Sequence, residues 1–412
     1  MKISFISPYF KNIWSADGIG NIVAYCKNNF KGNLNVSFFH GNFDNELDII
    51  NKVSLSDIAF FSCTTPTYKN GVYLASRIKN INKNIRIVFG GWNSSTVRSI
   101  EDDVIDQIVI GEGEEAVLSI LNGNMNSIIY GTKLNFNSIP WPDRDLIKQN
   151  DVLNLCESMC NERIISIQSI RGCKFNCKMC GESCMSGTYN KNTNPLRIRD
   201  PIDVLDEIEY LQYKFKIDRI KLLDPTWAVA EDVVFAFCEE KIKRNNNIKF
   251  DVMVHAGLAT EKSIEIMSKA YCDVIMVGCE SGSQRVLNDI GKGITLSKIK
   301  DVFAWGRKYN IQRRAFFILG FEKSYSDIEK TKQLIRDISP DIIGVSILSP
   351  YPGTCFYDSI KYKDVDWSKV DEYNSFWANE YFTNQQLKDI QKSLNDEFKD
   401  ILVAHQRGKI NE

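Results

Sequence analysis

Short apolar runs alternate with helix-like stretches along this chain, and this alternation limits the folds that the chain can adopt. Apolar strands separated by helices favour a parallel sheet, because each helix returns the chain to the same end of the sheet and covers one of its faces. We therefore predict an α/β fold with a doubly wound sheet in residues 1–130. The strands expected there are Ile3–Ser7, Val36–Phe39, Ile58–Ser62, Ile85–Phe89 and Gln107–Ile110.

A second series of strands and helices begins near Ile164. Its expected strands are Ile164–Ile170, Arg219–Asp224, Ile248–Val254, Val274–Cys279, Arg314–Leu319 and Ile342–Leu348. Six such steps predict a partial (βα)6 barrel, in which chemistry lies at the C-terminal ends of the strands. Ligands of an open, Rossmann-like sheet, which we predict for the first domain, lie at the same ends.

These patterns divide the chain into four regions. The Rossmann-like domain is expected over 1–130 and the partial barrel over 164–350. Residues 131–163 are expected to form a linker, because two prolines near Trp141 remove backbone donors and disfavour both helix and central strand. An aromatic and helical region over 351–412 completes the chain.

Composition narrows the compartment and the partners. The 412 residues carry a formal net charge of −1, which gives no electrostatic case for nucleic acid or an anionic membrane as a partner. No apolar run approaches the roughly 20 residues that span a bilayer, and the N-terminus lacks a signal-peptide pattern, so we expect a cytoplasmic protein. The twelve cysteines then favour free thiols and a metal site over disulfides, while only three histidines are present.

Three of those cysteines stand directly after the expected strand Ile164–Ile170. Cys173, Cys177 and Cys180 form a C-x3-C-x2-C loop. Three thiolates can hold three irons of a cubane cluster and leave the fourth iron open for another ligand. The alternatives are scattered core cysteines, or a zinc site or closed cluster with Cys184 as a fourth ligand.

This loop resembles the cluster-binding loop of the radical S-adenosylmethionine (SAM) superfamily. The resemblance implies a 4Fe–4S cluster whose open iron binds SAM, and electron transfer that cleaves SAM to a 5′-deoxyadenosyl radical. Met179 stands where the family usually has an aromatic residue, although a thioether can also pack on a ring. Turns later in the chain match the family's SAM-contacting turns, and the resemblance implies that Asp224, Glu280 and Ser281 contact SAM.

The first domain resembles the cobalamin-binding module of cobalamin-dependent radical SAM enzymes. The resemblance rests on turns after three expected strands and implies that these turns contact cobalamin. The residues concerned are Ser62, Thr64, Gly90, Gly91, Trp92, Gly111 and Glu112. A D-x-H-x-x-G motif is missing from the sequence, so no histidine is expected to ligate cobalt from below. Trp92 then either covers a cobalt face or fills an emptied pocket.

The resemblance implies cobalamin-dependent methyl transfer to an unactivated centre of a small-molecule or peptide substrate. It also implies an electron donor such as flavodoxin or ferredoxin. One alternative is a cobalamin-free epimerase or rearrangement enzyme in which Cys355 donates a hydrogen atom to a substrate radical, although a buried core cysteine is the simpler interpretation of Cys355. A non-catalytic iron–sulfur or cobalamin carrier or sensor is the other alternative. Reductive cleavage of SAM distinguishes the enzymes from the carrier.

Overall fold

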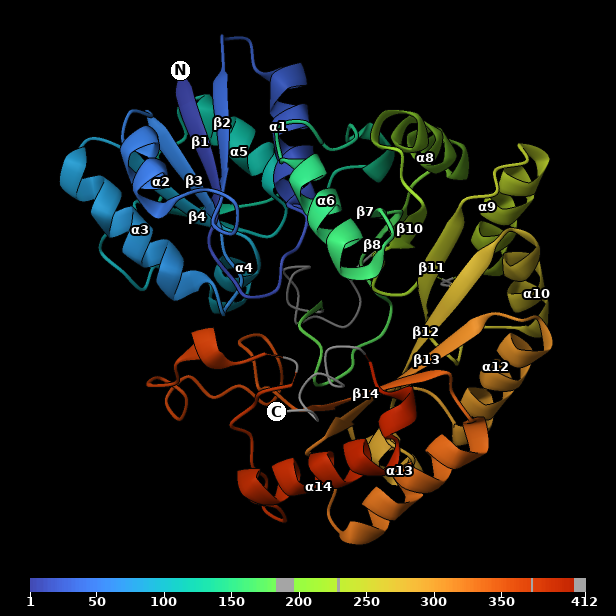
Figure 1. Ribbon diagram of the computed structural model, residues 1–412. Coiled ribbons are helices and arrows are strands. Elements are labelled where there is room, and N and C mark those ends of the chain that lie inside the picture. The colour runs from blue at the N-terminus through green and yellow to red at the C-terminus, as the bar shows by residue number, and fades with distance from the viewer. Residues whose placement is uncertain (183–195, 228–229, 372, 404–412) are drawn as a thin grey trace. The chain divides into compact units, whose positions relative to one another are not determined.

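The chain forms two compact units in a computed structural model (Figure 1). The structure describes residues 1–182, 196–227, 230–371 and 373–403. Unit 1 comprises Met1–Asn161, Gly181–Asn194 and Tyr351–Lys369, and unit 2 comprises Glu162–Cys180, Pro195–Pro350 and Val370–Glu412. The last segment of unit 1 is therefore separated in sequence from Met1–Asn161 by the whole second sheet.

Unit 1 is built on one parallel sheet, which has six strands within the described residues and the order β2-β1-β3-β4-β5-β6. The strands are β1 (Lys2–Ser7), β2 (Asn35–His40), β3 (Ile58–Ser62), β4 (Arg86–Gly90), β5 (Gln107–Ile110) and β6 (Ile128–Tyr130). All five strands expected here are present, and β6 is additional. The strand order reverses between β1 and β3, so the carboxyl ends of these two neighbouring strands form a topological switch point.

Helices cover both faces of this sheet. One face packs on α2 (Glu46–Val53) and α3 (Tyr68–Ile81), and the other packs on α1 (Asp17–Asn29) and α5 (Gly113–Leu121). The strands are apolar on both sides for this reason, as the buried run Ile58–Phe61 shows. The α/β prediction is thus confirmed for unit 1.

Unit 2 is built on a second parallel sheet, with the order β14-β13-β12-β11-β10-β7 among the described residues. Its strands follow the sequence order from one edge to the other. They are β7 (Ile164–Ile167), β10 (Arg219–Leu222), β11 (Lys249–Val254), β12 (Cys272–Glu280), β13 (Gln312–Leu319) and β14 (Ile342–Ile347).

The helices of unit 2 connect these strands, except for the last one, which follows β14. They are α8 (Pro201–Phe215), α9 (Glu231–Lys243), α10 (Glu261–Lys269), α11 (Gln284–Asp289), α12 (Leu296–Lys308), α13 (Tyr325–Ile338) and α14 (Asn384–Glu397). Helix α8 illustrates their local signals: the Asp200 side chain caps its first turn and Pro201 occupies an N-terminal position.

One expectation about local structure was wrong, and one helix was not anticipated. The expected strand Ile164–Ile170 is divided into β7 and the short β8 (Ile170–Arg171), which pairs with β9 (Arg197–Ile198). The division arises because the backbone amides of Ser169 and Ile170 donate to the Asp224 carboxylate instead of continuing the ladder. The region 131–163 also contains an unexpected helix, α6 (Gln149–Cys160), which buries one apolar side chain, Leu153, and therefore has a weak helical pattern.

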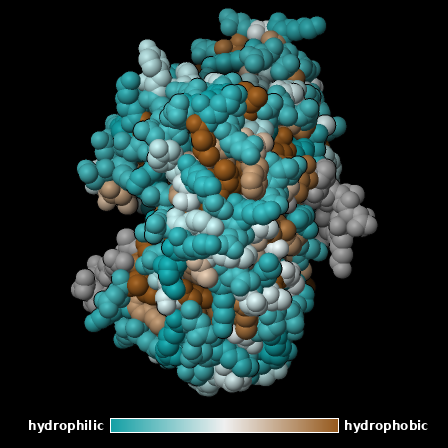
Figure 2. Space-filling model, turned by 90° about the vertical axis from the view of Figure 1, so that its right-hand side faces the viewer, coloured by the Kyte–Doolittle hydropathy of each residue, from teal (hydrophilic) through white to brown (hydrophobic). Residues whose placement is uncertain are grey.

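The surface is mainly hydrophilic on the face drawn in Figure 2, where hydrophobic side chains appear in small separate groups. Within the described ranges, none of the helices has the length and apolar character needed to cross a bilayer.

Lys241 on α9 is the most unusual core residue, because its side chain is fully buried. Its ammonium donates to the carbonyls of Asn246 and Ile248 at 2.6 and 2.8 Å. Burial lowers the pKa of Lys241 from its ordinary 10.5 to about 8. Between these values the unfolded chain binds more protons than the folded chain, so stability rises with pH in that window.

We expect the stability difference between wild type and Lys241→Met to depend on pH. From about pH 8 to about pH 9.5 the wild type should gain about 1.5 kcal/mol relative to the variant, because the burial penalty on the charged amine disappears. Urea unfolding at several pH values measures this gain. Lys243→Met, on the same helix but 76% exposed in its side chain, is the control. A difference that stays constant with pH would contradict the prediction.

Candidate functional site

The three loop cysteines lie directly after β8 in unit 2. Gly172 begins the loop with a φ of +92°, which a glycine adopts without strain. The amide of Cys180 donates to the carbonyl of Cys177 at 3.0 Å, so the second half of the loop is a tight turn. Cys173 and Cys177 are partly buried and Cys180 is exposed.

The thiols of this loop do not gather on one point. Within the described residues, no three His, Cys, Asp or Glu side chains are grouped as a single metal ion would require. A cubane makes a different demand, because each thiolate binds its own iron. Cys184, the alternative fourth ligand, lies outside the described residues.

Asp224 follows β10 and holds the start of the cysteine loop. Its carboxylate accepts from the amides of Ser169 and Ile170, both at 2.8 Å, and from the Ser169 hydroxyl. The residue is 2% exposed. Burial raises the pKa of Asp224 to about 6, although the hydrogen bonds lower it. The carboxylate therefore fixes the point where the chain leaves the sheet, and its contact with SAM stays a prediction.

Glu280 ends β12 and forms a buried ion pair with Lys292. The Lys292 ammonium donates to Glu280 Oε1 at 2.6 Å, and the two side chains are 13% and 8% exposed. Burial lowers the pKa of Lys292, but the Glu280 charge outweighs it and leaves that pKa raised, so the pair is ionic. Glu280 has a φ of +60°, an uncommon conformation for a residue with a side chain.

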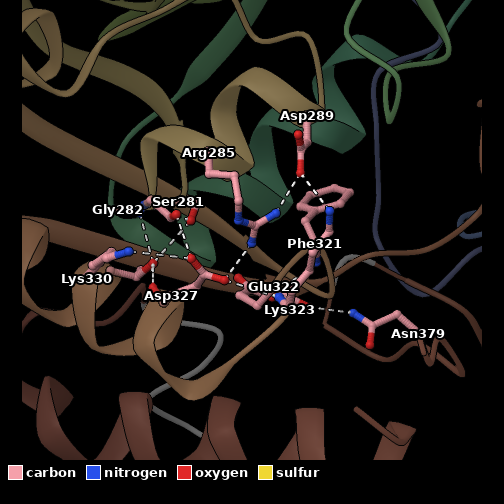
Figure 3. A network of polar contacts seen from close by, with 12 residues as sticks. Ser281, Gly282, Arg285, Asp289, Phe321, Glu322, Lys323, Asp327, Lys330 and Asn379 are labelled. Atoms are coloured by element: carbon pink, nitrogen blue, oxygen red, sulfur yellow. Dashed lines mark hydrogen bonds and ion pairs between the residues drawn. The ribbon is translucent and has the colours of Figure 1, made fainter. Parts of the chain in front are cut away.

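Ser281 lies next to Glu280 in a buried polar network (Figure 3). Its hydroxyl accepts from the amide of Ser283 at 3.2 Å and lies 3.4 Å from the Thr331 hydroxyl. Asp327 accepts from the Ser283 hydroxyl and from Arg285 at 2.7 and 2.6 Å. The network fixes the turn after β12 against α13, so Ser281 is held in place whether or not it contacts a ligand.

Sequence reasoning missed His255, which follows β11. Its ring stacks on Phe175 of the cysteine loop, with 3.7 Å between centroids and 14° between planes. Nε2 donates to the carbonyl of Lys292 at 3.0 Å, since a carbonyl can only accept. Nδ1 is buried and has no hydrogen-bond partner within the part of the chain that the structure describes. Burial lowers the pKa of His255 to about 4, so the ring is neutral. The sequence did contain a signal for this residue: His255 is one of only three histidines and comes directly after an expected strand.

The predicted residues of unit 1 meet at one edge of the first sheet. Ser62 and Gly90 are register partners at the ends of β3 and β4. Gly91 has a φ of +86°, and a Cβ there would lie 2.9 Å from the Cys63 carbonyl oxygen. Trp92 begins the short helix α4 (Trp92–Val97), and a Cβ at Gly181 would lie 2.6 Å from its indole.

The turn after β5 is tied to the same edge. The Gly111 amide donates to the Ser95 hydroxyl at 2.9 Å, and that hydroxyl donates to the Gly91 carbonyl at 2.8 Å. Glu112 follows as the residue before α5 and is partly buried. Thr64 is exposed, whereas the neighbouring Thr65 hydroxyl is buried and finds no hydrogen-bond partner in the described ranges. Sequence reasoning had not singled out Thr65.

Cys355 lies in the segment Tyr351–Lys369 of unit 1 and is exposed. The simpler interpretation of Cys355 as a buried core cysteine was therefore wrong. Two aromatic pairs, Tyr351–Trp367 and Tyr357–Trp367, lie in the same segment, with centroids 5.5 and 6.2 Å apart.

Comparison with known proteins finds a family match over the segment that carries this site. Residues 167–335, which hold the cysteine loop and the turns after β10 and β12, match the Radical SAM superfamily. An uncharacterized methyltransferase of Pyrococcus horikoshii is 25% identical over 363 residues, 80% of this chain and 76% of that protein. An anaerobic magnesium-protoporphyrin IX monomethyl ester cyclase of Rubrivivax gelatinosus is 26% identical over 77% of this chain, which spans 60% of that protein's length.

Solved structures share the fold over most of the chain. The radical SAM methyltransferase TsrM from Kitasatospora setae, with cobalamin and a 4Fe–4S cluster bound, has a TM-score of 0.70 and 13% identity over 86% of this chain and 76% of that chain. The cobalamin-dependent SAM radical enzyme OxsB, with aqua-cobalamin bound, has a TM-score of 0.65 and 16% identity over 97% of this chain and 62% of that chain.

The segment that carries the cysteine loop is therefore similar to the Radical SAM superfamily. One relative over most of the chain is named as a methyltransferase, and the chain shares the fold of TsrM and OxsB over most of its length. A radical SAM domain implies a 4Fe–4S cluster and SAM.

We expect Gly91→Ala to destabilise the protein more than Gly123→Ala. Both glycines have a positive φ, +86° and +97°, but a Cβ at Gly123 would meet nothing within 4 Å. The strain shared by both variants costs about 1 kcal/mol, and the clash with Cys63 should add about 1–3 kcal/mol at Gly91. Urea unfolding of the two variants measures the difference. Equal losses would mean that the turn after β4 relaxes without cost.

Proposed function

We propose that this enzyme cleaves SAM reductively and transfers a methyl group to a small-molecule or peptide substrate with the help of cobalamin. The observation that carries the proposal is the C-x3-C-x2-C loop anchored at the carboxyl end of a parallel sheet, within the segment that matches the superfamily. When bound, the cluster supplies the electron that yields a 5′-deoxyadenosyl radical, and cobalamin carries the methyl group.

Cys173, Cys177 and Cys180 would hold the cluster. Their loop leaves the sheet at a point fixed by Asp224, and its exposed and partly buried thiols are accessible to iron. Three thiolates suit a cubane with one iron left for SAM.

SAM would bind at the ends of β10, β11 and β12. These strands are neighbours, so the residues after them share one edge of the sheet. Two groups at this edge, the Thr226 hydroxyl and Nδ1 of His255, are buried without a hydrogen-bond partner among the described residues, and a polar ligand would supply one. Asp224, Glu280 and Ser281 are the proposed contacts. The protein's part is to orient SAM and exclude water around it.

Cobalamin would bind at the edge of the first sheet where β3, β4 and β5 end. Gly90, Gly91 and Gly111 let the backbone approach a large ligand. Ser62 and Thr64 are exposed, and the buried Thr65 hydroxyl has no hydrogen-bond partner from any described residue, which supports a polar ligand here. Trp92 and Glu112 complete the proposed contacts.

The cobalt would have no histidine ligand from His40. This residue is 2% exposed, and its ring nitrogens contact the Trp14 carbonyl at 3.3 Å and the Asn42 amide at 3.2 Å. The absence of a D-x-H-x-x-G motif from the sequence agrees with this.

Anaerobic reconstitution with iron, sulfide and cobalamin tests the proposal. We expect the desalted wild type to hold iron and cobalt and to release 5′-deoxyadenosine from SAM once reduced. Cys177→Ala should lose most of its iron and all SAM cleavage but keep its cobalt, because the cobalamin contacts are in unit 1. Cys160→Ala, which removes an exposed thiol on α6, is the control. A protein without iron would contradict the proposal, and iron without cobalt would reject its cobalamin part.

The exposed Cys355 favours a second candidate, radical epimerisation, because a solvent-accessible thiol can donate a hydrogen atom. Incubation with small-molecule and peptide libraries in D2O separates the two reactions by mass spectrometry. Methyl transfer adds a methyl group and should persist in Cys355→Ser. Epimerisation adds deuterium, and Cys355→Ser should abolish this while SAM cleavage continues.

A further inference from the structure

The segment Ile290–Gly293, which follows α11, lies along the cysteine loop. The amide of Lys178 donates to the Ile290 carbonyl at 2.9 Å. A Cβ at Gly291 would lie 3.5 Å from the Asn176 carbonyl oxygen, and a Cβ at Gly293 would lie 3.8 Å from the Phe175 ring. Both glycines have a φ of +69°. The segment is thus shaped to follow the loop through the stretch that includes Cys177.

A second contact joins the same segment to the loop through His255. This side chain is 7% exposed and stacks on Phe175. Its Nε2 donates to the Lys292 carbonyl at 3.0 Å. The Phe175 ring is therefore held by a side chain that is itself attached to Lys292.

The side chain of Lys292 extends from this segment to Glu280. The ammonium lies 2.6 Å from Glu280 Oε1. A Cβ at Gly278 would lie 2.5 Å from that oxygen and 2.8 Å from the Lys292 Nζ, so only glycine leaves room for the pair. The Lys292 carbonyl thus holds His255, which stacks on the cysteine loop, and the Lys292 side chain holds the carboxylate at the end of β12.

We propose that Lys292 is a positioning residue that joins the cysteine loop to Glu280, so that the cluster and the SAM-binding carboxylate keep a fixed relation to each other. This inference rests on the proposed function. The Lys292 charge also has a consequence for the cluster, because a nearby buried cation favours the reduced, more negative form.

Three variants separate the effect of the position of the Glu280 carboxylate from the effect of the Lys292 charge. Lys292→Met removes the charge, Lys292→Arg keeps it, and Gly278→Ala displaces the ion pair without changing its charge. Exposed Lys262, on α10, supplies the control Lys262→Met. Thermal unfolding of each protein checks that it folds.

SAM binding and the midpoint potential of the reconstituted proteins are the main readouts. In Lys292→Met we expect the Kd for SAM to rise about tenfold or more, as for the loss of one charge-assisted hydrogen bond, and the midpoint potential to become more negative. Lys292→Arg should restore the potential and part of the affinity. Gly278→Ala should weaken SAM binding and leave the potential unchanged, because its charges are intact.

Trypsin supplies a readout that needs no cofactor. Lys174 and Lys178 are exposed on the loop, and cleavage there in cofactor-free protein should be several-fold faster in Lys292→Met than in Lys262→Met. If the wild type binds SAM but Lys292→Met matches it in Kd, potential and cleavage rate, the role of Lys292 is overturned. If the wild type itself takes up no iron and binds no SAM, the proposed function fails first.

Discussion

The buried Asp224 carboxylate is the interaction on which the site in unit 2 depends. The cysteine loop has no regular hydrogen-bond ladder, so its course is set by contacts at its start and along its length. Asp224 ends β7 and starts the loop by accepting from Ser169 and Ile170. Removal of a buried acceptor would leave two amides unsatisfied, at about 1–3 kcal/mol each. The loop is therefore connected to the end of β10, where a bound ligand would lie.

Three buried charges among the described residues are each matched by a specific partner. Asp224 is matched by backbone amides, Glu280 by the Lys292 ammonium, and Lys241 by two carbonyls. An unmatched buried charge is costly. The partners of Lys241 come from the turn that follows its own helix, so these hydrogen bonds stabilise the fold. Those of Asp224 and Glu280 come from distant segments at the carboxyl edge of the sheet, which is where we propose that SAM binds.

The sequence allowed prediction of the features that depend on local pattern. The strands of both sheets could be predicted because buried parallel strands are continuous apolar runs, as Ile58–Ser62 is, and the cysteine loop because its spacing is distinctive. Strand β6, three residues long, gave no such run. The Lys292–Glu280 and His255–Phe175 contacts could not be predicted, because they join segments separated in sequence and follow from the tertiary fold.

The backbone of Glu280 connects these observations. Of the described non-glycine residues with positive φ, Glu280 ends a strand, whereas the others lie next to helices, as Asn161, Lys216 and Ser339 do at helix C-caps. Such a conformation costs about 1–3 kcal/mol and persists where surrounding contacts enforce it. The ion pair with Lys292 is such a contact, and the missing side chain at Gly278 leaves room for it. The pairing of β12 with β13 shifts register between Gly278 and Glu280, so this irregularity of the strand and the ion pair together orient the Glu280 carboxylate.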